Sequence, residues 1–333
     1  MPDATFILLV LTVISSYFYA FVGGFTDASN VIATSVGSRV LSPLAAVGMA
    51  SVTQFLGALT GTAVALTLGK GLIDPSSITL LTVIAAIAGT MSWSLFVYRF
   101  GIPVSETHGL IGGILGASIA TAGLGVVHWA GLTKVLVAII ASPVLGVLGA
   151  LIIATIAYRL SQRGSPSLLS PLFSNLQRLS AIFMGFSHGR NDAQKPMGVL
   201  TMALAVYYGW TEIQVPLWVI GSCAFFAALG LFAGGWRIIK TLGFKLTRLR
   251  PIDGFSAEVS AASVLQFASV LGIPVSTTHT ITSAIMGVGI SRRLSAVDWT
   301  LAQEIVISWI LTLPVTTVLG ALFSLALNAL FAR

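Results

Sequence analysis

Charged side chains are scarce in this sequence. Of its 333 residues, 8% are Asp, Glu, Lys or Arg, whereas 56% are hydrophobic. About a quarter of the residues in an average soluble domain are charged. Seventeen basic and ten acidic side chains cannot cover a water-soluble surface, which excludes a soluble enzyme, a nucleic-acid-binding protein and a disordered chain. The mean hydropathy of +0.97 predicts a multi-pass protein in the lipid bilayer of a cell membrane.

Cysteine is almost absent too. Cys223 is the one cysteine, so no internal disulfide can form and the redox compartment is not indicated. A signal-peptide pattern is also missing, because the apolar residues 4–23 are preceded by Asp3 and by no basic residue. We expect this stretch to be a retained first membrane span. We expect no cofactor and no resident metal ion.

Long apolar stretches fill the rest of the chain, interrupted by charged residues or by glycine and proline. They predict an all-α polytopic membrane protein with about ten membrane-crossing segments, some of them broken or re-entrant. The segments are 3–38, 44–68, 79–99, 102–122, 133–159, 178–207, 216–236, 254–271, 273–290 and 299–331.

The basic residues predict the orientation of these segments. Ten crossings place twelve Lys and Arg residues on one side of the membrane and three on the other. The three are Lys70, Lys134 and Arg333, and the twelve lie in the alternate connections, mainly 159–178 and 237–253. Lysine and arginine are retained on the cytoplasmic side. Both termini are therefore predicted to be extracytoplasmic. In a bacterium the protein is expected in the cell inner membrane.

Two sequence motifs occur twice, in the same order. Residues 101–108 read GIPVSETH and residues 272–279 read GIPVSTTH, and Asp27-Ala28 has a counterpart in Asp192-Ala193. The duplicated unit spans five crossings, an odd number, so its two copies must have opposite orientations. Inverted repeats are typical of secondary transporters. We predict a first repeat over 1–160, a cytoplasmic linker over 161–177 and a second repeat over 178–333.

The first motif places a carboxylate beside a second polar side chain. Asp27 and Asn30, like Asp192 and Lys195, are three residues apart and share one face of a helix. Asp27 and Asn30 offer oxygen ligands for a hard cation. Asp192 and Lys195 offer an internal ion pair whose ammonium could replace a bound cation, which makes proton exchange the natural coupling chemistry. The alternative is an ion pair that only holds two helices together.

The second motif predicts an anion site at two helix starts. Proline is common in the first turn of a helix, where backbone N–H groups have no internal partner. Hydroxyl groups in such a turn, at the positive end of the helix dipole, can bind an anion. The candidates are Ser105, Thr107, Ser276, Thr277 and Thr278. A capped helix start without a ligand is the alternative for a single copy of the motif.

Several other polar residues in apolar surroundings are accessory candidates, because ionisable groups inside a bilayer are costly. His108 and His279 could relay protons, bind the anion or cap the helix. Glu258 has no evident partner in sequence, and Gln54 is its rough counterpart in the first half. The accessory candidates are Gln54, Glu106, His108, Arg190, Glu258 and His279. His188 is one residue too close to Asp192 for the His-x4-Asp motif of acyltransferases, and we assign it no role.

Taken together, GFTDASN, GIPVSETH, SHGRNDAQKPMG, GFSAEVSAA and GIPVSTTHTITSAIMGVG resemble the inorganic phosphate transporter (PiT) family, closest to its short bacterial members. The resemblance covers about residues 5–330. It implies phosphate import by symport with Na⁺ or H⁺, a homodimer as one assembly, and a role in coupling for the Asn-Asp-x-x-Asn signature, which here includes Asn191. It also implies that the Pro-Val-Ser-x-Thr-His hydroxyls bind phosphate.

The chain departs from the family pattern at three positions. Thr26 replaces the first Asn of one signature, Lys195 replaces the last Asn of the other, and Glu106 replaces a small hydroxyl residue. Lys195 weakens one Na⁺ site and agrees with proton coupling. We therefore expect a proton-coupled phosphate importer that works by alternating access. The alternatives are Na⁺-coupled phosphate symport, a sulfate permease of the same fold, a passive anion channel and, remotely, an intramembrane enzyme.

Overall fold

The computed structural model describes residues 4–331, and over these residues the chain is a bundle of helices without a β-strand. Asp3 and Arg333, which entered the predictions of span and orientation, lie outside the described residues. The helices are α1 (Ala4–Gly37), α2 (Pro43–Ala58), α3 (Ala63–Lys70), α4 (Leu80–Tyr98), α5 (Glu106–Ala122), α6 (Trp129–Ser161), α7 (Pro166–Asp192), α8 (Gln194–Tyr208), α9 (Leu217–Ala233), α10 (Trp236–Lys240), the π-helical turn η3 (Thr241–Lys245), α11 (Pro251–Val270), α12 (Thr277–Arg292) and α13 (Trp299–Phe331). Three short 3₁₀ turns lie at Pro75–Ser77, Leu124–Val126 and Leu294–Ala296.

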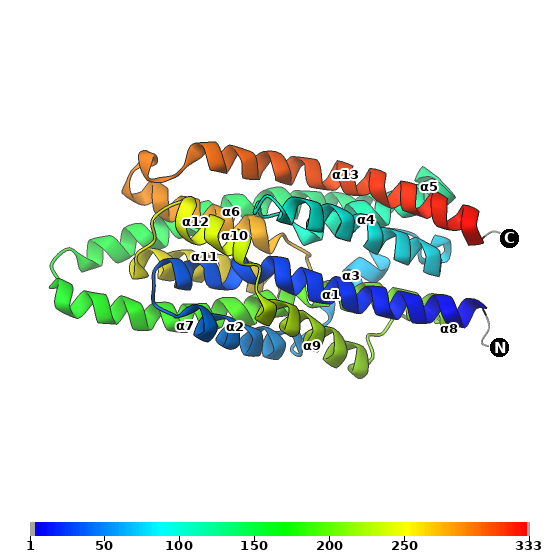
Figure 1. The fold of residues 1–333 in the computed structure, drawn as a ribbon, viewed down its shortest axis with the longest axis horizontal. Coiled ribbons are helices and arrows are strands. Elements are labelled where there is room, and N and C mark those ends of the chain that lie inside the picture. The colour runs from blue at the N-terminus through cyan, green and yellow to red at the C-terminus, as the bar shows by residue number, and fades with distance from the viewer. Residues whose placement is uncertain (1–3, 332–333) are drawn as a thin grey trace.

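Within residues 4–331, four helices are long and apolar enough to cross a membrane by themselves: α1, α4, α6 and α13. Two bent pairs, α2 with α3 and α9 with α10 and η3, raise the number to six if each pair forms one span. The predicted count of about ten crossings is therefore not confirmed. The start of α1 and the end of α13 lie at the same end of the bundle (Figure 1).

Two predicted segments are interrupted. The segment 44–68 bends by 70° between α2 and α3. The Gln194 side chain stabilises the new helix start, because its Oε1 accepts hydrogen bonds from Val64 N (2.8 Å) and Ala65 N (3.2 Å). The segment 178–207 is divided at Ala193, where α7 ends and α8 begins. A partner from another part of the chain decides the first break, so local sequence could not predict it.

The predicted linker 161–177 is mostly helical. Helix α7 begins at Pro166, because proline is tolerated in the first turn, and it runs without a break to Asp192. The non-helical connection is limited to residues 162–165. The polarity of 161–177 reflects exposure of this helical end rather than a loop.

The two GIPVS turns have the same backbone. Gly101 and Gly272 take φ values of +70° and +67°, a left-handed conformation that glycine adopts without steric cost. The chain then stays extended up to Ser105 and Ser276, which are the N-cap residues of α5 and α12. Both helices therefore start four residues later than the predicted 102 and 273. Proline keeps its preceding residue out of the helical region, which explains the delay.

The last long helix of each half packs against the other half. Helix α6, the last of the first half, lies against α12 and α11 of the second half. Helix α13, the last of the second half, lies against α5 and α4 of the first half. These contacts between the two halves are compatible with the predicted inverted repeat, which stays a prediction. Helix α1 runs through the middle of the bundle (Figure 1) and contacts α9, α4 and α8. Its Asp27 is buried.

The contact between α5 and α13 requires a glycine. A Cβ atom at Gly116 would lie 1.8 Å from the backbone oxygen of Thr317. We expect Gly116→Ala to destabilise the protein by about 1–3 kcal/mol or more, because the two backbones must separate. Thermal unfolding of the purified variant measures the effect. Gly221→Ala, also in a helix but with nothing within 4 Å, is the control and should not lower the melting temperature. Equal melting temperatures for Gly116→Ala and the wild type would contradict the close packing of α5 against α13.

Candidate functional site

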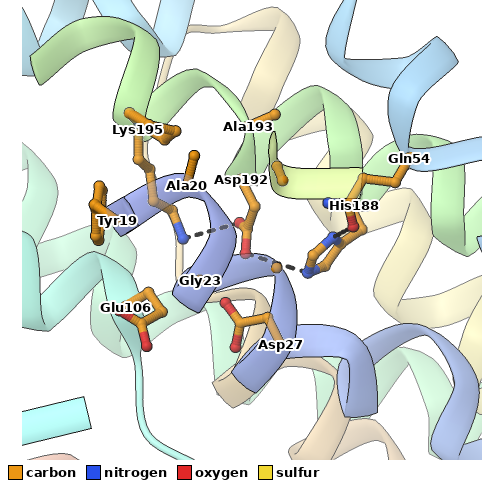
Figure 2. A pocket seen from close by; sticks show the side chains of 13 residues that line it. Tyr19, Ala20, Gly23, Asp27, Gln54, Glu106, His188, Asp192, Ala193 and Lys195 are labelled. Carbon is orange, nitrogen blue, oxygen red and sulfur yellow. Dashed lines mark hydrogen bonds and ion pairs between the residues drawn. The ribbon is translucent and has the colours of Figure 1, made fainter. Parts of the chain in front are cut away.

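The break between α7 and α8 holds a buried ion pair. Lys195 Nζ lies 2.9 Å from Asp192 Oδ1, and His188 Nε2 lies 3.2 Å from Asp192 Oδ2 (Figure 2). The side chains of Lys195 and His188 are 3% and 0% exposed, so water contributes little to their solvation. A charged group removed from water must be paired and hydrogen-bonded. The Asp192 carboxylate supplies that pairing for the Lys195 ammonium.

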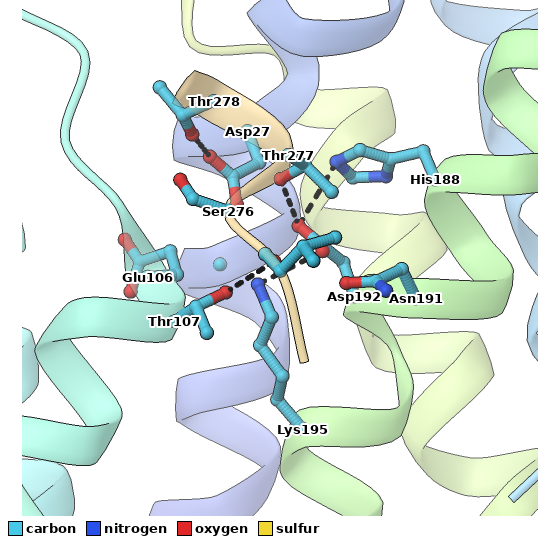
Figure 3. Close-up of polar contacts among 12 residues, drawn as sticks. Asp27, Glu106, Thr107, His188, Asn191, Asp192, Lys195, Ser276, Thr277 and Thr278 are labelled. Atoms are coloured by element: carbon cyan, nitrogen blue, oxygen red, sulfur yellow. Dashed lines mark hydrogen bonds and ion pairs between the residues drawn. The ribbon is translucent and has the colours of Figure 1, made fainter. Parts of the chain in front are cut away.

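The second aspartate, Asp27 on α1, is held by the start of α12. Thr278 Oγ1 donates to Asp27 Oδ1 at 3.1 Å, and Asn30 Nδ2 donates to the same oxygen at 2.9 Å. Asn30 Nδ2 also lies 2.9 Å from Thr278 Oγ1. The neighbouring Thr277 Oγ1 donates to Asp192 Oδ2 at 2.9 Å (Figure 3). Adjacent threonines of one helix turn thus connect the two aspartates that the sequence repeats.

A small cavity of about 20 Å³ lies between these groups. A cavity of about 10–15 Å³ holds one water molecule, so this one has no room for a five-atom tetrahedral anion. Its polar lining comes from both halves of the chain: Tyr19, Asp27, Gln54, Glu106, His188, Asp192 and Lys195. The charged side chains of the site therefore fill most of the space between them.

The five hydroxyl groups predicted to bind the anion do not line this cavity. Ser105 Oγ and Ser276 Oγ accept hydrogen bonds from His108 N (3.2 Å) and His279 N (3.1 Å), so both serines are helix caps. Thr107 Oγ1 donates to the backbone oxygen of Val275 at 2.9 Å, which ties the first turn to the second. With Thr277 and Thr278 bound to the aspartates, these side chains have protein partners in this structure.

Three of the polar groups have the spacing of a cation site. Asp27, His188 and Asp192 each offer a ligand atom, and these atoms all lie within 4.8 Å of one another. Of these three residues, Asp27 was predicted from the sequence to be a ligand for a hard cation, together with Asn30, whereas His188 was given no role. Two carboxylate oxygens and an imidazole nitrogen suit a divalent cation better than Na⁺, which prefers oxygen ligands alone. The Lys195 ammonium already lies beside the Asp192 carboxylate and balances its negative charge.

Glu106 faces the cavity from the first turn of α5. Its Oε1 accepts a hydrogen bond from Thr26 Oγ1 at 3.0 Å, and its side chain is 2% exposed. Thr26 and Glu106, two of the three departures from the family pattern, are therefore in direct contact. Figure 2 shows the Glu106 carboxyl group on the opposite side of the cavity from Asp192, with the Lys195 ammonium directed between them.

The remaining accessory candidates have separate places. Gln54 Oε1 contacts His188 Nδ1 at 3.0 Å and lines the cavity, so it supports the site and does not mirror Glu258. His108 and His279 stack edge to face with ring centroids 4.4 Å apart, and His279 stacks on Trp309 at 3.9 Å. Neither histidine lines the cavity.

Glu258 lies in a polar cluster of its own, between α1, α7 and α11. Its carboxyl group accepts hydrogen bonds from Thr34, Ser35, Gln177 and Ser180. The absence of a partner nearby in sequence was misleading, because all four donors come from distant helices.

Asn191 and Arg190 do not belong to the residues that line the cavity. The Asn191 amide is hydrogen-bonded to Ser269 at 3.1 Å. Asn191 therefore joins α7 to α11 beside the site, and its amide also lies 3.3 Å from Asp192 Oδ1.

Sequence reasoning missed two residues of the site, His188 and Tyr19. His188 precedes Asp192 by four positions, a spacing that puts both side chains on one face of a helix. That spacing was visible and could have identified His188. Tyr19, 1% exposed, also lines the cavity. It lies among the apolar residues of α1, and no sequence signal distinguishes it from a core aromatic residue.

Known proteins resemble this chain over nearly its whole length. The phosphate transporter family matches residues 23–169 and 161–320. A protein of Rhizobium meliloti named "Probable low-affinity inorganic phosphate transporter" is 45% identical over 324 residues, which is 96% of this chain and 97% of that protein. A protein of the same name from Bacillus subtilis is 38% identical over 332 residues, covering 99% of this chain and 100% of its own.

Among solved structures, the fold is similar to that of "The sodium-dependent phosphate transporter". The TM-score is 0.88, the sequence identity is 24%, and the match covers 98% of this chain and 100% of the other. That identity supports a shared fold. The family and the named relatives are transporters, not enzymes, and the long apolar helices agree with a multi-pass membrane protein. This chain belongs to the phosphate transporter family.

Proposed function

We propose that this protein imports inorganic phosphate together with protons, by alternating access around Asp27, Asp192 and Lys195. The names of the relatives from Rhizobium meliloti and Bacillus subtilis support phosphate as the substrate. The observation that carries proton coupling is the Lys195 ammonium, 2.9 Å from Asp192 and buried with it. A transported cation would have to compete with it for this carboxylate.

An ammonium group on a side chain cannot be released with the substrate. It supplies the positive charge that a bound Na⁺ would otherwise bring to Asp192. The positive charge that is co-transported with phosphate must therefore come from another cation. Protons can move on the carboxyl groups of Asp27 and Glu106, both of which line the cavity. Phosphate can also carry a proton itself, as H₂PO₄⁻.

Phosphate binding would exchange hydrogen bonds rather than fill an empty site. In this structure Thr277 and Thr278 donate to the two aspartates that line the cavity. We infer that an entering anion takes over these donors, together with the free N–H groups at the starts of α5 and α12. The aspartates would then lose hydrogen-bond donors and bind protons more readily. This exchange couples the anion to the proton, and its reversal on the other side of the membrane completes alternating access.

Uptake of radiolabelled phosphate into proteoliposomes tests the proposal, with an imposed Na⁺ gradient and, separately, an imposed pH gradient. We expect accumulation against the phosphate gradient with the pH gradient alone. A requirement for Na⁺ would refute proton coupling, and uptake that never exceeds equilibrium would indicate a channel. Inhibition by arsenate but not by selenate or molybdate would distinguish phosphate from sulfate as the substrate.

Removal of a hydroxyl from either helix start should weaken phosphate binding. We expect Ser105→Ala and Ser276→Ala each to raise the half-saturation concentration by about five- to a hundredfold, equivalent to about 1–3 kcal/mol for a buried hydrogen bond. Each change also removes a helix cap, which costs about 1 kcal/mol of stability.

Serine-to-threonine variants separate the two effects, because they keep both the hydroxyl group and the cap. The half-saturation concentrations of Ser105→Thr and Ser276→Thr should stay near that of the wild type. Unchanged values in both alanine variants would exclude the hydroxyl groups of Ser105 and Ser276 as ligands of phosphate.

A further inference from the structure

A second cavity, of about 670 Å³, lies where η3 and its following loop meet the end of α12 and the start of α13. Its lining contains five basic residues, Lys245, Arg248, Arg250, Arg292 and Arg293, and one acidic residue, Asp298. We call this cavity the basic pocket. It is separate from the transport site in its residues and about 30 times larger in volume.

Hydrogen bonds hold the walls of the basic pocket in place. Arg292 Nη2 donates to Thr247 Oγ1 at 2.9 Å and to the backbone oxygen of Arg248 at 2.7 Å. The backbone N–H of Asp298 donates to the backbone oxygen of Leu246 at 2.9 Å. The two connections that form the pocket are therefore joined across it, and the pocket exists before any ligand arrives.

The positive charge of the pocket is only partly balanced. The buried carboxyl group of Asp253 lies 3.3 Å from Arg250 Nε and 3.6 Å from Arg292 Nη1. Lys245, Arg248 and Arg293 are exposed, and none of them takes part in the ion pairs found within residues 4–331. Retention of basic residues on one side of a membrane explains their sign. It does not require five of them to converge on one cavity.

We propose that the basic pocket binds a phosphate-bearing anion at the membrane surface. Guanidinium groups match phosphate oxygens in geometry and charge, and basic pockets between transmembrane helices accept anionic headgroups. An anionic phospholipid and a soluble phosphate compound present the same group.

The rim of the basic pocket favours the lipid. Phe244 lines it and is 49% exposed, while Leu294 and Trp299 beside it are 67% and 45% exposed. Tryptophan and other aromatic side chains are enriched at the level of lipid headgroups. A lipid could place its phosphate among the basic residues and its acyl chains on this apolar rim.

Native mass spectrometry of the full-length protein in detergent, with added phosphatidylglycerol, tests the proposal. The pocket variant is Lys245→Gln with Arg248→Gln and Arg293→Gln, which spares the two arginines paired with Asp253. The control variant is Arg159→Gln with Arg163→Gln and Arg178→Gln, three exposed residues outside the pocket with the same loss of charge. Thermal unfolding confirms that both variants are folded, and the single substitution Arg248→Gln replaces the triple variant if that one is not.

We expect the affinity of the pocket variant for phosphatidylglycerol to be lower than that of the wild type by about tenfold or more. The control variant should bind the lipid as the wild type does. Retained lipid that millimolar pyrophosphate does not displace identifies a phospholipid as the occupant. Displacement by pyrophosphate, with the same loss in the pocket variant, supports the pocket with a soluble phosphate compound as its occupant. An equal loss in both variants, or no loss in the pocket variant, would overturn the proposal.

Discussion

Replacing Asp192 with asparagine should abolish the accumulation of phosphate in proteoliposomes. The carboxyl group contacts Lys195 (2.9 Å), His188 (3.2 Å) and Thr277 (2.9 Å), so it connects the charged residues of the second half to the first turn of α12. Removing one partner of a buried ion pair leaves the other charge uncompensated, at a cost of about 3–5 kcal/mol. We expect initial uptake rates to fall by about a hundredfold or more.

The variant Glu304→Gln is the matched control for Asp192→Asn. Glu304 is exposed on α13, and the substitution likewise replaces a carboxyl group with an amide. Yield and size-exclusion profile show whether each variant is folded, and uptake is compared at equal protein in the vesicles. Normal accumulation by Asp192→Asn would remove this residue from the mechanism.

Replacing Lys195 with asparagine should change the coupling ion. Without the ammonium group, Asp192 keeps a negative charge that needs a new cation, and the asparagine oxygen adds a ligand suited to a hard cation. We expect uptake driven by a pH gradient to fall by about tenfold or more. An imposed Na⁺ gradient should then stimulate uptake by Lys195→Asn but not by the wild type.

The variant Lys195→Arg shows whether the positive charge is the essential property. Arginine stays protonated throughout the accessible pH range, so this variant keeps the charge beside Asp192 but differs in shape. It should not gain a response to Na⁺. If Lys195→Asn keeps proton-driven uptake and does not respond to Na⁺, the lysine is structural and another group couples the proton.

Although α7 ends at Asp192 and α8 begins at Gln194, the pairing of Asp192 with Lys195 was predictable from their spacing of three residues. The same holds for Asp27 and Asn30, which are 2.9 Å apart in the structure. A helix start within each GIPVS motif was also predictable, but the capping serines Ser105 and Ser276 place both starts four residues after the predicted 102 and 273. Interactions of this range depend on backbone geometry alone.

The partners of the hydroxyl groups were not predictable. Thr278 and Asp27 are separated by 251 positions, and their contact exists only because α12 and α1 meet in the bundle. From the motif alone, these hydroxyls are predicted to bind the anion, and nothing local indicates their contacts with the aspartates. The four donors around Glu258 and the break between α2 and α3 have the same origin, because each depends on side chains from distant helices.

The sequence by itself determined that this is a helical membrane protein of the phosphate transporter family, because composition, apolar length and short motifs are local properties. It also determined which aspartates and helix starts occur twice. Only the tertiary structure decided that His188 and Gln54 join Asp192, that both aspartates contact α12, and that the cavity between them has a volume of about 20 Å³. The physical reason is that helix packing sets those distances. Apolar surfaces facing lipid and apolar surfaces facing another helix have the same composition, so the sequence does not distinguish them.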